Sequence, residues 1–160
     1  MKPSRPGSLL VALAAAAAMM AGCGSGQPGT PDALDIGCQN DTRAMTYTAN
    51  MQLQGVSKFL TFVLEQSVPA PPIKGTNTWT LKVLDGSAQP VSDASLTVKP
   101  FMPDHGHGTS VVPQVAPAGD AYTISNLYLF MAGLWQVTIT VTTPSGTQND
   151  AAVFSFCVEG

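Results

Sequence analysis

Apolar and polar residues alternate with a period of two along most of the chain beyond its N-terminal region. In LWQVTITVT, for example, Trp135, Val137 and Ile139 alternate with glutamine and threonine. Because successive side chains of a β-strand point to opposite faces, this pattern predicts half-buried antiparallel strands. We expect strands in the segments 45–53, 58–66, 78–84, 94–101, 121–130, 134–142 and 151–158.

Turn-forming residues separate these segments. The stretch 69–77 is rich in proline, Asp85-Gly86 is a hairpin signal, and 143–150 reads TPSGTQND. No amphipathic helical pattern follows the N-terminal region. About seven short strands at this spacing predict an all-β domain, an immunoglobulin-like antiparallel β-sandwich.

The N-terminus has the features of a targeting segment. Lys2 and Arg5 precede the apolar run LLVALAAAAAMM, which is too short to span a bilayer comfortably. The run leads into Met-Ala-Gly-Cys, and small residues before Cys23 fit a bacterial lipoprotein cleavage site, with Cys23 as the lipidated first residue. Ordinary cleavage nearby, which would discard Cys23, is the alternative. The Gly-, Pro- and Ser-rich stretch that follows is typical of a flexible tether.

These features predict a protein of the cell envelope that is anchored to a membrane by a lipid on Cys23 and faces the periplasm or the exterior. The chain beyond the tether is long enough for a single hydrophobic core. We expect a lipoprotein signal peptide at 1–22, a flexible tether at 23–36 and one folded domain at 37–160.

Two further cysteines, Cys38 and Cys157, lie at the two ends of the expected domain. In an oxidising compartment they are expected to form a disulfide. Closing so long a loop constrains the unfolded chain by about 4–5 kcal/mol on the entropic model. A thiolate metal site that uses Cys157 is the alternative, although no C-x-x-C spacing accompanies it.

Charge and motif content argue against several functions. Without Lys2 and Arg5, five basic residues stand against ten acidic ones, a net charge of about −5 with histidine neutral. A nucleic-acid partner would need a basic patch, so none is expected. The chain has no P-loop, no dinucleotide-binding glycine motif, no H-E-x-x-H and no nucleophile elbow. We therefore expect a protein that is not an enzyme.

Both histidines of the chain, His105 and His107, lie in the stretch PFMPDHGHGTS. Residues at i and i+2 in extended backbone point to the same side, and the glycine after each histidine allows the chain to curl around an ion. Met102 and Met131 each end an expected strand, so thioether and imidazole groups converge if both turns lie at the same end of the sandwich. This donor set favours copper over zinc. The alternative is a loop whose imidazoles face solvent, with Met102 closing the end of the core.

The stretch from Asn77 to Val158 resembles the YtkA-like domain family, which is related to FixH-like proteins of cytochrome oxidase assembly. The resemblance is carried by the box MPDHGHG and by the turn FMAGLW. One departure is Ala132, since the family usually has proline there. The matching residues are Met102, Pro103, His105, Gly106, His107, Gly108, Pro113, Tyr122, Phe130, Met131, Gly133 and Trp135.

The resemblance implies a compact exported immunoglobulin-like domain of a kind that is often lipid- or membrane-anchored and sometimes found near copper handling. Two functions remain open. The first is a tethered copper-binding module, acting as chaperone, buffer or sensor, with His105, His107, Met102 and Met131 as ligands. The second is a structural or protein-interaction domain without a metal, accessory to a membrane complex. In either case the expected partner is a membrane protein or a metal-handling protein.

Overall fold

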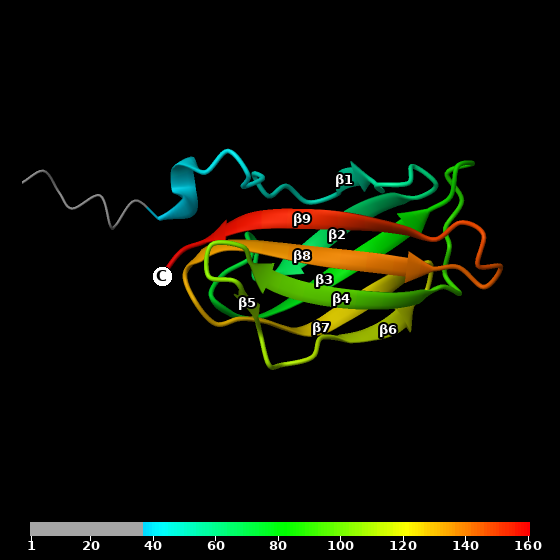
Figure 1. Ribbon diagram of the computed structural model, residues 1–160. Coiled ribbons are helices and arrows are strands. Elements are labelled where there is room, and N and C mark those ends of the chain that lie inside the picture. The colour runs from blue at the N-terminus through cyan, green and yellow to red at the C-terminus, as the bar shows by residue number, and fades with distance from the viewer. Residues whose placement is uncertain (1–36) are drawn as a thin grey trace, which may run out of the picture. The chain divides into compact units, whose positions relative to one another are not determined.

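The computed structural model describes residues 37–160, which form two antiparallel sheets packed face to face (Figure 1). The predicted signal peptide at 1–22, the lipidation site Cys23 and the tether at 23–36 lie outside the described residues. Within the described range, no helix has the length and apolar character needed to cross a bilayer. The predicted all-β sandwich is confirmed.

The larger sheet has the strand order β1-β2-β3-β7-β6, and the smaller sheet has the order β5-β4-β8-β9. A short 3-10 helix, η1 (Cys38–Asn40), precedes the strands. Six of the seven predicted segments overlap one strand each over most of their length. The strands are β1 (Met51–Gln54), β2 (Thr61–Val68), β3 (Gly75–Leu84), β4 (Ser95–Met102), β5 (His107–Gly108), β6 (Gln114–Ala118), β7 (Ala121–Leu129), β8 (Gly133–Thr142) and β9 (Asp150–Val158).

The first strand is shorter than the alternation predicts. The sequence predicts a strand over 45–53, whereas β1 pairs with β2 only from Met51 onward. Asn50 has a φ of 64°, a left-handed conformation that interrupts the extended backbone. Met45 and Tyr47 nevertheless pack against the core, and the Met45 N–H donates to the Ser155 carbonyl of β9 at 2.7 Å. Their alternation therefore reflects burial along the edge of the sandwich rather than strand pairing.

Two strands, β5 and β6, are not predicted from the sequence. β5 has only two residues, which is too short for any alternation to be visible. β6 is an edge strand of the larger sheet, and all its residues except Val115 are exposed. It also contains Pro117, which an edge strand tolerates because one side of its backbone has no neighbour to pair with.

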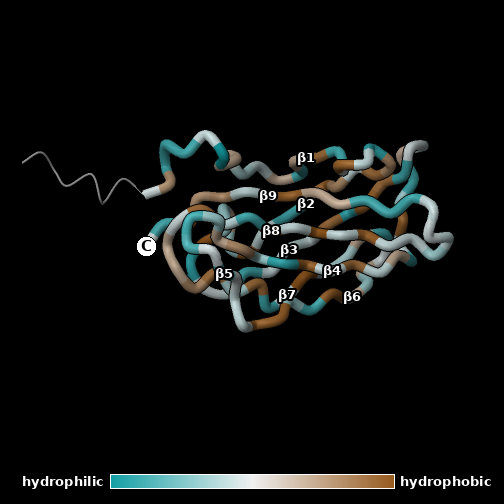
Figure 2. Tube along the Cα trace, in the orientation of Figure 1, coloured by the Kyte–Doolittle hydropathy of each residue, from teal (hydrophilic) through white to brown (hydrophobic). Residues whose placement is uncertain are grey.

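Aromatic side chains from both sheets meet in the core. Trp79 of β3 lies edge-on to Phe154 and Phe156 of β9, with ring centroids 5.9 and 5.7 Å apart. Trp135 of β8 is also fully buried, so both tryptophans are core residues, as their strand patterns predict. Figure 2 shows hydrophobic colours concentrated on the strands and hydrophilic ones on the loops that join them.

Tyr122 links the two sheets through its hydroxyl group. The Tyr122 O–H donates to the Val91 carbonyl at 2.7 Å and accepts from the Ala94 N–H at 2.9 Å, next to the start of β4. Burial raises the pKa of Tyr122. We expect Tyr122→Phe to lower the free energy of unfolding by about 1–2 kcal/mol, because both backbone groups lose their partner. Urea denaturation measures this difference.

Tyr128→Phe is the control for this substitution, because Tyr128 is 37% exposed and its hydroxyl can remain hydrated. Equal stability of the Tyr122→Phe and Tyr128→Phe variants would show that the inter-sheet hydrogen bonds contribute nothing.

Candidate metal site at one end of the sandwich

The histidine box folds as a tight hairpin directly after β4. The N–H groups of His105 and Gly106 donate to the Met102 carbonyl at 3.2 and 2.9 Å and close the turn. The two residues of β5 then pair back onto β4, with Met102 opposite His107 and Phe101 opposite Gly108. His105 thus lies in the turn, whereas His107 lies on a strand.

Each glycine of the box is required by the backbone. Gly106 has a φ of 70°, which side-chain-bearing residues rarely adopt. A Cβ on Gly108 would lie 2.6 Å from the Pro100 carbonyl oxygen. The glycines therefore have a structural explanation, but neither constraint requires an imidazole at position 105 or 107.

The histidine hairpin and the methionine turn between β7 and β8 are in contact. The His107 ring stacks on Phe130, with centroids 5.6 Å apart and planes inclined by 22°. On the core side, a Cβ on Gly133 would lie 2.7 Å from the Met102 Cε atom, so Met102 packs directly against that turn. The two turns predicted to be neighbours therefore meet at one end of the sandwich.

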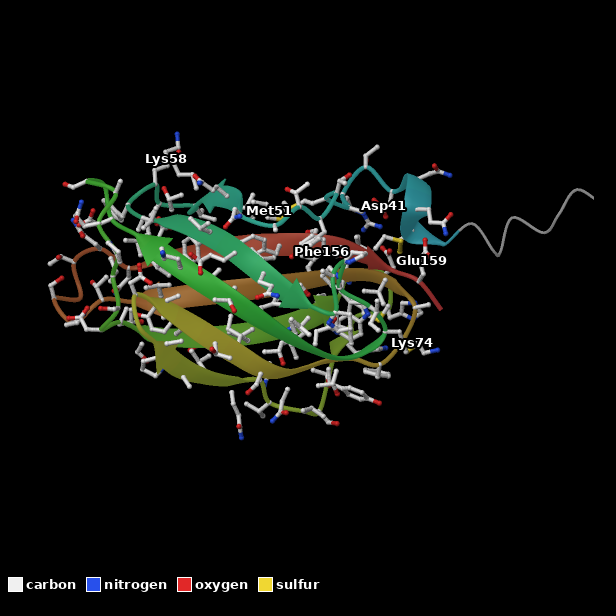
Figure 3. The ribbon with its side chains drawn as sticks, turned by 180° about the vertical axis from the view of Figure 1, so that it is seen from behind. Asp41, Met51, Lys58, Lys74, Phe156 and Glu159 are labelled. Atoms are coloured by element: carbon white, nitrogen blue, oxygen red, sulfur yellow. A yellow bond between two sulfur atoms is a disulfide. The ribbon has the colours of Figure 1, made fainter. Side chains whose placement is uncertain are left out.

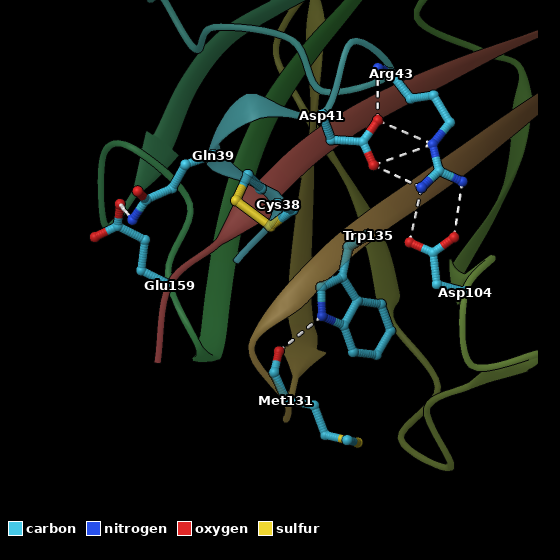
Figure 4. The surroundings of a disulfide bond; sticks show 9 residues. Cys38, Gln39, Asp41, Arg43, Asp104, Met131, Trp135 and Glu159 are labelled. Atoms are coloured by element: carbon cyan, nitrogen blue, oxygen red, sulfur yellow. Dashed lines mark hydrogen bonds and ion pairs between the residues drawn. A yellow bond between two sulfur atoms is a disulfide. The ribbon is translucent and has the colours of Figure 1, made fainter. Parts of the chain in front are cut away.

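The two methionines occupy different environments around this contact. Met102 is fully buried and belongs to the core, and as the cross-strand partner of His107 its side chain projects from the same face. Met131 is only partly buried, and its carbonyl accepts a hydrogen bond from Trp135 Nε1 at 2.9 Å (Figure 4). The accessible thioether is therefore that of Met131.

The two imidazoles are close enough to share an ion. Their ring centroids are 5.7 Å apart. An imidazole nitrogen bonds a metal at about 2 Å, so two rings on one ion have centres no more than about 6 Å apart. His107 Nδ1 lies 3.2 Å from the Gly108 carbonyl oxygen, which can only accept, so this contact is a hydrogen bond in the tautomer that carries its proton on Nδ1. In that tautomer Nε2 carries the lone pair with which a histidine binds a metal.

The imidazoles border different hollows. His105, which is exposed, lines a groove of about 800 Å³ together with η1, the start of β8 and the C-terminal end of β9. His107 lines a smaller hollow of about 440 Å³ with Tyr128 and Phe130. A single ion between the two rings therefore requires a rotation of the His105 side chain.

The donors available here are imidazole and thioether groups. Within residues 37–160, no three His, Cys, Asp or Glu side chains are grouped so that they could hold a metal ion. Asp104 precedes His105, but both of its carboxylate oxygens accept hydrogen bonds from Arg43 at 2.8 Å (Figure 4). This set fits a soft ion such as Cu(I), which thioethers select and imidazole also binds.

The predicted disulfide between Cys38 and Cys157 is present and joins η1 to β9 at the same end of the sandwich (Figure 4). Their Cα atoms are 5.2 Å apart. The alternative of a thiolate metal site at Cys157 is wrong, because its sulfur is bonded to that of Cys38. Sequence reasoning missed Asp41 and Arg43, which follow η1 in the chain. Arg43 pairs with Asp41 and also with Asp104 of the hairpin. No periodicity or motif links positions 43 and 104.

Comparison with known proteins identifies the family and little else. Residues 56–140, more than half of the chain, match the YtkA-like family. FetP of uropathogenic E. coli strain F11, in a crystal structure of the protein as isolated, is 11% identical over 71% of this chain and 96% of its own, with a TM-score of 0.46. A copper-bound variant of the same FetP is also 11% identical, over 71% of this chain and 97% of its own, with a TM-score of 0.47. Neither likeness is close enough to assign a function, and no functionally curated protein matches.

Proposed function

Since the chain belongs to the YtkA-like family, we propose that it is a lipid-anchored copper-binding module that works outside the cytoplasm. His105 and His107 are the primary ligands, and Met131 and Met102 supply thioether sulfur. The bound copper serves a chaperone, buffer or sensor role rather than catalysis.

The observation that carries this proposal is the way in which two contacts hold the His107 ring. The Nδ1 contact with the Gly108 carbonyl favours the tautomer with its proton on Nδ1, and the stack on Phe130 restrains the plane of the ring. A backbone acceptor on the second ring nitrogen is the usual arrangement for a metal-binding histidine. His105, with its ring 5.7 Å away and exposed, can rotate to provide the second nitrogen.

The methionines contribute unequally to this site. Met131 is partly buried and lies in the turn that meets the hairpin, whereas Met102 is buried in the core as the cross-strand partner of His107. A ligand set that combines imidazole with thioether suits Cu(I). Met131→Leu is therefore expected to weaken Cu(I) binding more specifically than Met102→Leu, which also changes core packing.

Cellular placement follows from the N-terminal sequence. A lipid on Cys23 would hold the domain at a membrane, and the tether at 23–36 would let it reach a neighbouring membrane protein or metal-handling protein. The disulfide between Cys38 and Cys157 supports an oxidising compartment such as the periplasm or the exterior.

A Cu(I) competition titration tests the proposal on the mature chain, purified without a histidine tag and carrying Cys23→Ser in place of the lipid. We expect one Cu(I) per chain and a loss of at least about 100-fold in affinity for the double variant His105→Ala/His107→Ala, since both nitrogen ligands are removed. Met131→Leu should weaken binding by about tenfold. Met51→Leu is the matched control, because Met51 lies on β1, away from this hairpin. Unchanged affinity in the double histidine variant would rule out these ligands.

A structural or protein-interaction role is the second candidate function. It is favoured by the glycines, whose presence the hairpin backbone explains without a metal, and by the burial of Met102 in the core. On this account the wild-type chain binds no Cu(I) above the level of the double histidine variant. Mutation of the hairpin would then abolish a protein contact instead.

A further inference from the structure

Arg43, in the segment between η1 and β1, forms ion pairs with two carboxylates, those of Asp41 and Asp104. The Arg43 guanidinium donates to both oxygens of Asp104, at 2.8 Å each, and Arg43 Nε donates to both oxygens of Asp41, at 2.9 and 3.1 Å (Figure 4). Planar, bidentate pairing of this kind fixes orientation as well as distance. Arg43 therefore sets where Asp104 can lie.

Asp104 belongs to the turn of the histidine hairpin. It lies between Pro103, which follows β4, and His105, whose own N–H closes the turn on the Met102 carbonyl. A movement of Asp104 would turn the backbone that carries His105. His107 is held separately, by strand pairing and by Phe130. His105 is thus the ligand whose placement depends on the Arg43 contact.

The segment that carries Arg43 is itself fastened to the sandwich on both sides. Before it, the Cys38–Cys157 disulfide and a hydrogen bond from Gln39 Nε2 to Glu159 Oε1 at 3.0 Å attach η1 to the C-terminal end of the chain. After it, the Met45 N–H bonds to β9. Figure 3 shows Asp41 and Glu159 at the same end of the molecule, with Lys58 at the opposite end. The segment that carries Arg43 is therefore attached to the sandwich both before and after this residue.

We infer that Arg43 is a positioning residue for the proposed copper site, holding the turn through Asp104 so that the His105 imidazole lies beside His107. The inference rests on the proposed function for its copper-binding consequence. The geometric part, that Arg43 holds the turn, stands on the hydrogen bonds alone.

A positioning role can be separated from a role in stability. The Arg43 and Asp104 side chains are 45% and 50% exposed, and exposed ion pairs contribute little to the free energy of unfolding. Arg43→Gln should therefore shift the thermal midpoint by no more than about 2 °C. A folded variant with altered metal binding is the result that a purely stabilising role would not produce.

Lys82 offers a matched control within the same chain. It also lies between two carboxylates, Glu65 at 3.0 Å and Asp120 at 2.8 Å. It is on β3 near the end that pairs with the start of β7, whereas the methionine turn follows the other end of β7. Lys82→Gln therefore removes an equivalent charge and an equivalent pair of contacts without touching the hairpin.

The experiment compares Arg43→Gln, Arg43→Lys and Lys82→Gln with the parent chain in two measurements. Without metal, hydrogen exchange of the amides from Asp104 to Gly108 should accelerate by about fivefold or more in both Arg43 variants and stay unchanged in Lys82→Gln. The affinity for Cu(I) should fall by about tenfold in both Arg43 variants, because residues that orient a metal ligand typically affect affinity to this extent. It should not change in Lys82→Gln. Lysine is expected to fail because an ammonium group lacks the planar fork of donors with which Arg43 pairs both oxygens of Asp104.

The two measurements separate the possible failures. Faster exchange in both Arg43 variants, together with a parent chain that binds no Cu(I), would overturn the proposed function and leave the turn-holding role of Arg43 in place. Unchanged exchange and unchanged affinity in Arg43→Gln would overturn the inference. Full recovery by Arg43→Lys would also overturn it, because charge alone would then be sufficient.

Discussion

Removing the disulfide with Cys38→Ser/Cys157→Ser is expected to lower the free energy of unfolding by about 4–5 kcal/mol. The bridge closes a loop across a sequence separation of 119 residues, and its loss restores that loop entropy to the unfolded chain. Guanidinium denaturation of the two proteins without reductant measures the difference. For a domain of this size such a loss is a large share of the total stability.

A reductant provides the matched control for this prediction. Dithiothreitol should destabilise the parent chain by a similar amount and leave the double serine variant unchanged. A double variant as stable as the parent would contradict the entropic account and indicate that the sandwich determines its stability without the bridge.

Replacing Asp150 with alanine is expected to cost about 3 kcal/mol. Asp150 is 4% exposed, and its carboxylate accepts the N–H groups of Ser57, Phe59, Leu60 and Ala151 at 2.7 to 3.1 Å. Alanine leaves several partly buried donors without an acceptor, and each such group costs about 1–3 kcal/mol when it stays dry. Urea denaturation measures the loss.

The control is Asp85→Ala, because Asp85 accepts two backbone N–H groups, those of Ser87 and Gln89, in an exposed turn. Water can replace an acceptor there, so the cost should stay below about 1 kcal/mol. An equal cost at positions 85 and 150 would show that burial of the carboxylate is not what makes its contacts important.

The stabilising effect of Asp150 should also depend on pH. Burial by itself raises the pKa of Asp150, but the four backbone donors outweigh burial, and the pKa lies below its ordinary value. The stability that Asp150 contributes is therefore fully present above the unfolded pKa of about 3.9 and is lost as the pH falls through the folded pKa. The stability gap between the parent chain and Asp150→Asn should narrow from pH 5 to pH 2. A constant gap over that range would contradict the lowered pKa.

The strands that face the core could be predicted because burial on one side imposes alternation. β8 and β9 follow their predicted segments within a residue. The strand predicted over 45–53 fails in its first half because partial burial of Met45 and Tyr47 gives the same alternation without pairing. β6 could not be predicted, because an exposed edge strand has no apolar face to repeat.

The residues of the candidate site could be singled out from the sequence, but the contacts that hold them in place could not. Residue chemistry singled out His105, His107 and the two methionines, and the position of the cysteines indicated their bridge. The contact of His107 with Phe130 depends on how two turns meet, which strand register decides. The Arg43–Asp104 pair joins residues 61 positions apart on an exposed surface, where neither hydrophobic periodicity nor a motif constrains the sequence.

X-ray absorption at the copper edge of the Cu(I)-loaded mature chain, carrying Cys23→Ser and no tag, tests the central claim most directly. The ligands proposed here predict two imidazole nitrogens at about 2.0 Å and at least one sulfur at about 2.3 Å. The sulfur signal should weaken in Met131→Leu, and the imidazole signal should be lost in His105→Ala/His107→Ala. A spectrum without imidazole or sulfur scattering in the parent chain, or one that these substitutions leave unchanged, would contradict the assignment of this hairpin as a copper site.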